Sequence, residues 1–230
     1  MDLKVSEIFA SIQGEGPSAG APSVFLRLAQ CNLHCAWCDT KYTWDWTTYR
    51  FEDEVRTESV SAVAVRLRAH SEQRLVVTGG EPLLQEEALF ELFRLLDERA
   101  RYVIEIETNG TIAPSEALAS RVDQWNVSPK LANSGDPERL RLRPEALRAF
   151  AATGRAFLKL VVESKADAAE ADALATSLDW PRERVLLMAQ ALTRESLAER
   201  GPLVSADALS RGLRYSPRLH VERWNGARGT

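Results

Sequence analysis

The stretch SVFLRLAQCNLHCAWC, residues Ser23 to Cys38, joins a run typical of a buried β-strand to a loop that carries every cysteine of the 230-residue chain. Side chains alternate along a strand, so Val24 and Leu28 fall on one face while Arg27 falls on the other. We expect the apolar face to pack against helices and the charged face to point into a polar interior. The cysteine loop begins directly where this strand ends.

The loop spaces its thiols as C-x3-C-x2-C, with Cys31, Cys35 and Cys38 and no cysteine elsewhere in the sequence. Three thiolates can hold three irons of a four-iron cluster and leave the fourth iron open to a small molecule. A Cys3His zinc site that includes His34 is the alternative, but structural zinc usually takes ligand pairs from two separated loops, and His34 directly precedes Cys35. A disulfide would leave one thiol over. The spacing therefore favours a 4Fe-4S cluster over zinc.

The composition argues against several classes of protein. With 29 Lys and Arg against 33 Asp and Glu, the formal charge of -4 offers no general attraction for nucleic acid. The first residues lack a basic segment followed by an apolar run, and no stretch approaches the roughly 20 apolar residues of a membrane span. We expect a cytoplasmic protein without membrane or nucleic-acid partners. The length suits one domain, residues 1–230, and 45% apolar residues suffice for its core.

Short apolar, β-branched runs alternate with helical patterns along most of the chain, which predicts parallel βαβ units. The clearest predicted helix runs from Pro82 to Ala100, with an apolar stripe that includes Leu89 and Phe93. Extended segments from Leu3 to Ala10 and from Arg218 to Trp224 flank this body as short N- and C-terminal extensions. The predicted strands of the body are Ser23 to Ala29, Arg74 to Thr78, Tyr102 to Glu107, Val122 to Val127, Ala156 to Val162 and Arg184 to Met188.

Three charged residues, Glu105, Glu107 and Lys159, interrupt these apolar strands. Buried charges are costly unless they are paired or bound to something. A closed eight-stranded barrel filled with aliphatic layers would exclude them, whereas an open barrel with a polar interior accepts them. The charges could pair only with one another, but as a set they favour a bound ligand, and Glu105 stays outside the candidate site. The predicted fold is α/β, an incomplete TIM-type β/α barrel.

Polar or glycine-rich segments follow four consecutive predicted strands. The cysteine loop follows the first, and the next three end in Thr78-Gly79-Gly80-Glu81-Pro82, Glu107-Thr108-Asn109-Gly110 and Ser128-Pro129-Lys130. The carboxyl ends of parallel strands meet at one rim, where ligand-binding loops gather. Paired glycines let the backbone approach a ligand, and free N–H and C=O groups there can bind a zwitterion. The sequence therefore predicts one ligand site at this rim, beside the cysteines.

The cysteine loop followed by Gly79-Gly80-Glu81-Pro82 resembles the radical S-adenosylmethionine (SAM) superfamily. Within it, the chain is similar to the 7-carboxy-7-deazaguanine synthase family from Ser11 to its end, in the order and spacing of several short motifs. These motifs are Ser11-Ile12-Gln13-Gly14-Glu15-Gly16, Cys38-Asp39-Thr40, Glu107-Thr108-Asn109-Gly110, Ser128-Pro129-Lys130, and Arg218-Leu219-His220-Val221 with Trp224-Asn225-Gly226. Ala189 is a departure, because the family commonly has proline there.

The resemblance implies a lyase that converts 6-carboxy-5,6,7,8-tetrahydropterin to 7-carboxy-7-deazaguanine with loss of ammonia, on the route to queuosine and other 7-deazapurines. It implies a 4Fe-4S cluster, SAM and Mg²⁺ as cofactors, with SAM binding the open iron through its amine and carboxylate. It also implies an external one-electron reductant of the flavodoxin or ferredoxin type, and a homodimer. The cofactors then supply the hard chemistry and the protein supplies position.

The same resemblance implies three groups of site residues. Cys31, Cys35 and Cys38 would hold the cluster, and Thr40 would bind Mg²⁺, although its hydroxyl alone indicates only a turn cap. The residues implied for SAM are Trp37, Cys38, Asp39, Gly80, Ser128, Pro129, Lys130 and Gln190. Those implied for the pterin are Ile12, Gln13, Gly14, Arg27, Thr78 and Thr230, with the guanidinium fork of Arg27 on the substrate carboxylate.

Other interpretations remain open at this point. A radical SAM activase that acts on a partner protein shares the C-x3-C-x2-C loop, and a structural zinc module would need no polar interior. Arg27 and the stretch from Gln13 to Glu15 favour a small anionic substrate over a protein partner. The aromatic loop from Lys41 to Arg50 is predicted to pack on the core rather than to shield a cluster.

Overall fold

The structure, a computed structural model, describes residues 1–97 and 102–230. Its strands are β1 (Asp2–Ile12), β2 (Pro22–Leu28), β3 (Arg56–Ser59), β4 (Arg74–Gly79), β5 (Val103–Thr108), β6 (Gln124–Val127), β7 (Ala156–Val162), β8 (Val185–Ala189) and β9 (Arg214–Ser216). Its α-helices are α1 (Phe51–Glu54), α2 (Val60–Arg68), α3 (Glu86–Asp97), α4 (Glu116–Arg121), α5 (Glu138–Arg141), α6 (Pro144–Ala152), α7 (Lys165–Ser177), α8 (Arg194–Ser210) and α9 (Leu219–Trp224). Short 3₁₀ turns are η1 (Lys41–Thr43), η2 (Pro82–Gln85), η3 (Ala132–Ser134) and η4 (Arg182–Arg184).

The strands form one sheet in the order β3-β1-β2-β4-β5-β6-β7-β8-β9. From β2 onward neighbouring strands pair in parallel, and β1 pairs antiparallel with both β2 and β3. Six of the parallel strands, β2 and β4 to β8, agree within two residues with the strands predicted for the body. The prediction of parallel βαβ units is therefore confirmed.

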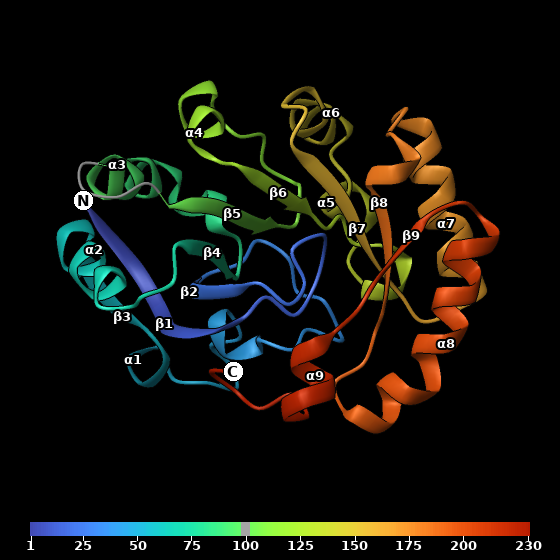
Figure 1. Ribbon diagram of the computed structural model, residues 1–230, viewed down its shortest axis with the longest axis horizontal. Coiled ribbons are helices and arrows are strands. Elements are labelled where there is room, and N and C mark those ends of the chain that lie inside the picture. Colours follow the sequence, from blue (N-terminus) through green and yellow to red (C-terminus); the bar gives the residue numbers. More distant parts are fainter. Residues whose placement is uncertain (98–101) are drawn as a thin grey trace.

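The sheet curves into an arc, and helices α2, α3, α4, α6, α7 and α8 lie along its outer side (Figure 1). Within the described part of the chain the two edge strands, β3 and β9, do not pair with each other, so the barrel stays open. This arrangement confirms the predicted incomplete β/α barrel. Because β2 and β4 to β8 are parallel and adjacent, their carboxyl ends share one rim.

The apolar core lies between the sheet and the outer helices. Val24 and Leu28 of β2 are fully buried, as are Leu89 and Phe93 of the α3 stripe. Truncation of such a side chain to alanine typically costs about 2–5 kcal/mol of stability. The outer face of the sheet thus supplies the stability, which leaves the inner face free for polar side chains.

Both terminal extensions contact the body, but only the first is a strand. The segment from Leu3 to Ala10 lies within β1, as expected. The prediction that Arg218 to Trp224 is extended is wrong, because Leu219–Trp224 forms α9 and ends at Asn225 in a left-handed conformation. Its residues Leu219 and Val221 alternate with polar neighbours as in a strand, and six residues are too few to show a helical period.

Other boundaries also differ from the sequence predictions. Pro82 opens the 3₁₀ turn η2 rather than α3 itself, which begins at Glu86. The last predicted positions of that helix, 98–100, lie outside the described residues. Strands β3 and β9, of four and three residues, were not predicted because such short runs carry too few alternations to show a period of two.

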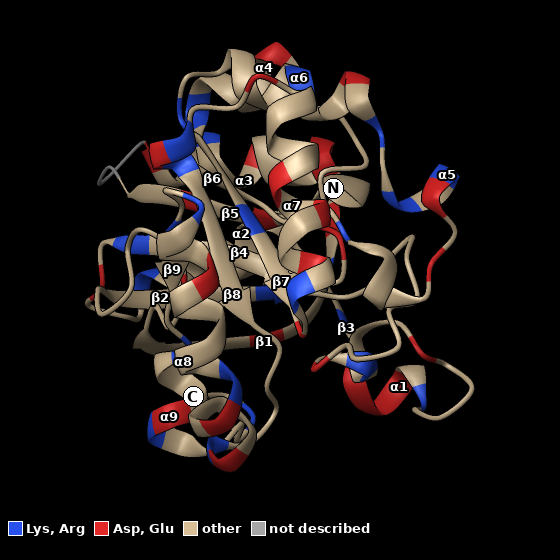
Figure 2. Ribbon diagram, turned by 90° about the vertical axis from the view of Figure 1, so that its right-hand side faces the viewer, with Lys and Arg blue, Asp and Glu red and all other residues tan. Residues whose placement is uncertain are grey.

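Charged residues of both signs are spread over the helices and loops (Figure 2). Among the described residues, none of the helices has the length and apolar content that crossing a membrane requires.

Candidate active site

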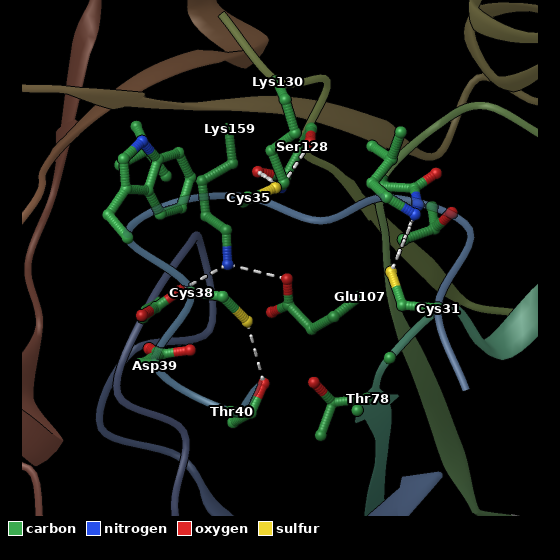
Figure 3. Close-up of a pocket in the computed structure, with 18 of the residues that line it drawn as sticks. Cys31, Cys35, Cys38, Asp39, Thr40, Thr78, Glu107, Ser128, Lys130 and Lys159 are labelled. Carbon is green, nitrogen blue, oxygen red and sulfur yellow. Dashed lines mark hydrogen bonds and ion pairs between the residues drawn. The ribbon is translucent and has the colours of Figure 1, made fainter. Parts of the chain in front are cut away.

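The three thiols line one cavity at the rim of the sheet, together with residues in or directly after β4, β5, β6, β7 and β8 (Figure 3). We call it the cysteine cavity. Its lining is Glu15, Cys31, Leu33, Cys35, Trp37, Cys38, Asp39, Thr40, Trp44, Thr78, Gly79, Gly80, Glu107, Thr108, Asn109, Ser128, Lys130, Lys159, Val161, Met188, Gln190 and Arg218.

The sulfur atoms accept hydrogen bonds of the kind that stabilise thiolate ligands. Trp44 Nε1 donates to Cys38 Sγ at 3.3 Å, and the backbone N–H of Leu33 donates to Cys31 Sγ at 3.5 Å. His34, the candidate fourth ligand of a zinc site, is exposed and packs its ring 4.9 Å from that of Trp44. The donor set that faces the cavity is therefore three sulfurs without an imidazole.

Burial sets the protonation of two of these thiols. It raises the pKa of Cys31 to about 11 and that of Cys35 to about 12. Both groups are thus neutral thiols near neutral pH until a metal displaces their protons. Cys35 is buried, Cys31 and Cys38 are half-buried, and the three thiols that line this one cavity match the ligand number and type of a 4Fe-4S cluster with one open iron.

The paired glycines after β4 have a packing role as well as a place in the cavity wall. A Cβ on Gly80 would lie 1.8 Å from the carbonyl oxygen of Gln30, and one on Gly79 would lie 2.0 Å from that of Leu28. Only glycine lets this turn approach the segment that leads into Cys31. The glycines therefore hold the end of β4 against the cysteine loop.

Glu81, the next residue of this motif, joins two strand ends. Its buried carboxylate accepts hydrogen bonds from the backbone N–H of Leu83 at 3.0 Å, from the Thr108 hydroxyl at 2.8 Å and from the Asn109 N–H at 2.7 Å. Its position inside the fold, with both oxygens occupied, indicates a structural function.

The residues predicted for SAM gather in the cysteine cavity, with one exception. Lys130 Nζ donates to the Ser128 carbonyl at 2.7 Å and lies 5.9 Å from the centre of the Trp37 ring. Gln190 follows β8 and is held by Arg200 of α8, which donates to its backbone carbonyl at 2.9 Å. Pro129 is buried but does not line the cavity.

Ala189, where the family commonly has proline, does not disturb this end of the cavity. It pairs with Val162 as the last residue of β8, and the N–H of Gln190 continues the ladder by donating to the Val162 carbonyl at 2.9 Å. The strand hydrogen bonds therefore bring Gln190 into the cavity wall.

A second cavity adjoins the first and is closed on one side by the C-terminal residues Gly226–Thr230, which we call the tail. We call this space the tail cavity. Its lining is Phe9, Ile12, Gln13, Gly14, Glu15, Phe25, Arg27, Cys38, Asp39, Thr40, Tyr42, Thr78, Gly79, Glu107, Ala191, Leu192, Arg218, His220, Val221, Gly226, Ala227, Arg228, Gly229 and Thr230. Every residue predicted for the pterin is among them.

Arg27 reaches the tail cavity from β2, as its strand face predicted. Its Nε donates to Glu7 Oε2 at 2.7 Å, and its guanidinium lies 5.6 Å from the centre of the Phe9 ring. Anchoring through Nε fixes the plane of the guanidinium. Burial raises the pKa of Glu7, but the charge of Arg27 and the hydrogen bond from Arg228 outweigh it, so the pKa lies below its ordinary value.

The charges predicted on the inner face are paired with one another. Lys159 Nζ donates to Glu15 at 2.6 Å and to Glu107 at 2.7 Å, and Figure 3 shows the amine between these contacts. Burial lowers the pKa of Lys159, but the two carboxylates raise it further, so the net shift is upward. Glu105, left out of the candidate site, binds Arg74 at 2.9 Å and does not line either cavity.

Thr40 lies where the two cavities meet. It stands at the N-cap position of η1, yet within the described residues its side chain makes no capping bond. Its hydroxyl lies 3.7 Å from Cys38 Sγ and lines both cavities (Figure 3). The hydroxyl is hydrogen-bonded to Cys38 Sγ, and its oxygen retains lone-pair capacity for a ligand in the cavities.

Several lining residues escaped the sequence prediction. Trp44 bonds Cys38, so this part of the aromatic loop contacts the cysteine loop. Tyr42 is buried, but it lines the tail cavity and donates to Glu7 Oε2 at 2.9 Å. The prediction that this loop packs on the core is therefore not confirmed. Glu15, Arg218 and His220 lay inside motifs but were assigned no role. Their partners are far away in the chain, and only the resemblance could have drawn attention to them.

The comparisons with known proteins identify the class of this chain. The model of the Radical SAM superfamily matches residues 27–161, more than half of the chain. The class of protein is thus a radical SAM enzyme, to which a 4Fe-4S cluster and SAM belong.

Similar proteins narrow the class. A 7-carboxy-7-deazaguanine synthase from Pyrobaculum aerophilum is 39% identical over 99% of this chain and 97% of its own length. One from Halobacterium salinarum is 37% identical over 98% of this chain and 91% of its own length. A crystal structure of QueE from Escherichia coli superposes with a TM-score of 0.70 at 27% identity, covering 94% of this chain and 93% of that one. The chain belongs to the 7-carboxy-7-deazaguanine synthase family.

Proposed function

We propose that the chain converts 6-carboxy-5,6,7,8-tetrahydropterin to 7-carboxy-7-deazaguanine with loss of ammonia, the activity for which its relatives are named. Full-length similarity supports the reaction. One structural observation carries the assignment of residues: those predicted for SAM, apart from Pro129, line the cysteine cavity, and those predicted for the pterin line the adjoining tail cavity. A cofactor and a substrate that must react need such adjoining spaces.

Cys31, Cys35 and Cys38 hold the cluster in this proposal, and the cysteine cavity binds SAM. When bound, the cluster and SAM together supply a 5'-deoxyadenosyl radical that can remove a hydrogen atom from carbon. The turn at Gly80 offers backbone groups to the methionine part of SAM, and Lys130 offers charge beside Trp37 and Ser128. The remaining assigned SAM residues are Asp39, Pro129 and Gln190.

The tail cavity binds and orients the pterin. Arg27 meets the substrate carboxylate, and the Nε anchor to Glu7 leaves the terminal nitrogens of the fork for a bidentate contact. Ile12, Gln13 and Gly14 offer backbone and amide groups to the fused ring, and Thr78 and Thr230 complete the assigned contacts. Gln13 Nε2 already donates to Glu105 and Glu107, at 2.5 and 3.2 Å, so its amide orientation is fixed before substrate arrives.

Thr40 is the proposed Mg²⁺ ligand. Its hydroxyl faces both cavities, and Mg²⁺ typically takes few protein oxygens and completes its shell with water and substrate oxygens.

Three further properties follow from the family alone. We propose an external one-electron donor of the flavodoxin or ferredoxin type, assembly as a homodimer, and a place in queuosine or 7-deazapurine biosynthesis in the cytoplasm. An activase that works on a partner protein is disfavoured, because the tail closes one side of the cavity that contains Arg27.

The direct test is product formation. Anaerobically reconstituted protein with SAM, Mg²⁺, dithionite and the carboxytetrahydropterin is expected to yield 7-carboxy-7-deazaguanine, followed by mass spectrometry. Cys35→Ala, treated in the same way, serves as the inactive control. An intact cluster with no deazaguanine would contradict the proposal.

A further inference from the structure

Arg218 occupies the boundary between the two cavities, and no function was assigned to it in the sequence analysis. It is 5% exposed, lies between β9 and α9, and lines both the cysteine cavity and the tail cavity. We propose that Arg218 is a positioning residue that ties the cysteine loop to the loop Gln13–Gly16 and thereby couples SAM binding to substrate binding. This inference rests on the proposed function.

The guanidinium of Arg218 joins three segments that are distant in sequence. Nη2 donates to Asp39 Oδ2 at 2.7 Å, directly after the last cysteine, and Nε donates to Glu15 Oε1 at 3.0 Å. Nη1 donates to the carbonyl of Ala191, beyond β8. Every nitrogen of the fork therefore has a partner on a different segment, which fixes the side chain in one orientation.

The backbone around Arg218 is bonded to the loop Gln13–Gly16 and, through the pairing of Ser216 with Met188, to β8. Among the described residues it makes no backbone hydrogen bond to the cysteine loop. The N–H of Gly16 donates to Ser216 Oγ at 2.8 Å, and the N–H of Leu219 donates to the carbonyl of Gly14 at 2.9 Å. These bonds hold residues 216–219 on the loop at the substrate end. Contact with the cysteine loop, by contrast, runs through the ion pair to Asp39, whose side chain is 47% exposed.

The charges explain why removal of Arg218 would let this arrangement change. The guanidinium lies between two carboxylates, with Asp39 Oδ2 at 2.7 Å and Glu15 Oε1 at 3.0 Å. Without the guanidinium the two carboxylates repel each other, and Glu15 keeps Lys159 as a partner at 2.6 Å. Asp39 is the one that can turn toward water.

Arginine and lysine differ at such a position. The planar fork serves two carboxylates and a carbonyl at once, whereas an ammonium is a point charge on a flexible stem. Arg218→Lys thus keeps the positive charge, but its ammonium cannot hold the carboxylates of Asp39 and Glu15 in the geometry that the guanidinium imposes. This variant separates the bridging geometry from the mere presence of a positive charge.

The coupling can be measured as reciprocal affinities. For the reconstituted wild-type protein we expect SAM to lower the dissociation constant of the pterin, and the pterin to lower that of SAM by the same factor, on the order of tenfold. In Arg218→Lys and Arg218→Gln this factor is expected to fall toward one, while either ligand alone binds within about threefold of wild type. A second readout is the ratio of 5'-deoxyadenosine to deazaguanine, which should rise as SAM cleavage loses its link to turnover.

Arg182→Met is the matched control. Arg182 is a surface arginine that pairs with Asp172 at 2.8 Å and lines neither cavity. It should keep the coupling factor. Should Arg218→Gln fail to retain the cluster, Glu15→Gln weakens the same link at the loop Gln13–Gly16. It should lower the coupling factor, with little further loss when it is combined with Arg218→Lys.

Two results would overturn the inference. One is a wild-type protein in which neither ligand affects the other, and the other is an Arg218 variant that keeps the wild-type coupling factor, whatever its absolute affinities. Deazaguanine formation by the wild type in the same preparation keeps the proposed function separate, since its absence counts against the function and not against Arg218.

Discussion

The cysteine cavity and the tail cavity adjoin, yet they are built in different ways. The first takes most of its lining from the ends of consecutive parallel strands, from the cysteine loop after β2 to Gln190 after β8. The second takes its lining from both ends of the chain, from Phe9 in β1 to Thr230 in the tail. A parallel sheet aligns its strand ends whatever the loops contain, whereas the tail cavity exists only when the C-terminal residues lie on the N-terminal strands.

The two cavities also differ in what holds them closed. The buried Lys159, which pairs with Glu15 and Glu107, lines the cysteine cavity and not the tail cavity. The tail is held by Arg228, which is 44% exposed, pairs with Glu7 and Glu54, and covers the ring of Tyr42 at 3.8 Å. The contrast indicates a fixed cofactor site beside a substrate site whose cover is the weaker part.

The largest effect that separates the cavities is expected from Cys35→Ala. Removing one of three cluster ligands should abolish both SAM cleavage and deazaguanine formation, because the cluster cannot be held by two thiols at this site. Binding of the pterin, followed by isothermal titration, should persist because Cys35 does not line the tail cavity. Loss of pterin binding in a folded variant would show that the two sites are not divided in this way.

Arg27→Met is expected to give the next largest effect, on the tail cavity alone. Loss of a bidentate contact, with about 1.5–3 kcal/mol for each of its two hydrogen bonds to a charged group, should raise the pterin dissociation constant at least about 100-fold. The affinity for SAM, measured on the same preparation, should stay unchanged. Arg27→Lys keeps the charge without the fork, so its pterin dissociation constant should lie between those of wild type and Arg27→Met. Unchanged pterin binding in Arg27→Met would refute the contact between Arg27 and the substrate carboxylate.

Acid sensitivity should reveal the buried pair next to the cysteine cavity. Burial raises the pKa of Glu15, but Lys159 and Arg218 outweigh it and bring the pKa well below its ordinary 4.5. The stabilisation by this depressed pKa is complete above about pH 4.5 and declines as the pH falls below it. Urea unfolding should therefore show a steeper loss of stability between about pH 5 and pH 3 for wild type than for Glu15→Gln. Equal slopes for the two proteins would exclude the ion pairs of Glu15 as the cause of the acid sensitivity.

The smallest effect is expected from Arg228→Met, which loosens the tail. Exposed ion pairs are typically worth about 0.2–1 kcal/mol, so the pterin dissociation constant should rise only about threefold. The wild-type value should drift toward that of the variant at high salt, because exposed charges are screened. If Arg228→Met changed the affinity for SAM and not the affinity for the pterin, the claim that the tail covers the substrate site would be contradicted.

The sequence predicted the parts that depend on local pattern. Alternation of apolar residues identified β2 and β4 to β8, and the glycines and polar residues after them identified the rim. The prediction that the glycines make room for a ligand was incomplete, since Gly80 also makes room for the carbonyl of Gln30. Close approach of two backbones is a tertiary property that a dipeptide does not reveal.

The parts that were missed depend on distant partners. Glu15 bonds Lys159 across 144 positions and Arg218 across 203, and neither pairing leaves a periodic trace. The helix α9 was mistaken for an extended segment because Val221 is its only buried residue, too little to show a face. Such contacts became visible only when the fold brought both chain ends to one site.

The division of the site between two cavities can be tested most directly by an anaerobic crystal structure of the reconstituted protein with SAM and the carboxytetrahydropterin. We predict a 4Fe-4S cluster on Cys31, Cys35 and Cys38, SAM against Gly80, Ser128 and Lys130, and the pterin carboxylate on Arg27 beneath the tail. A pterin bound among Ser128 and Lys130, or SAM in contact with Arg27, would contradict the account.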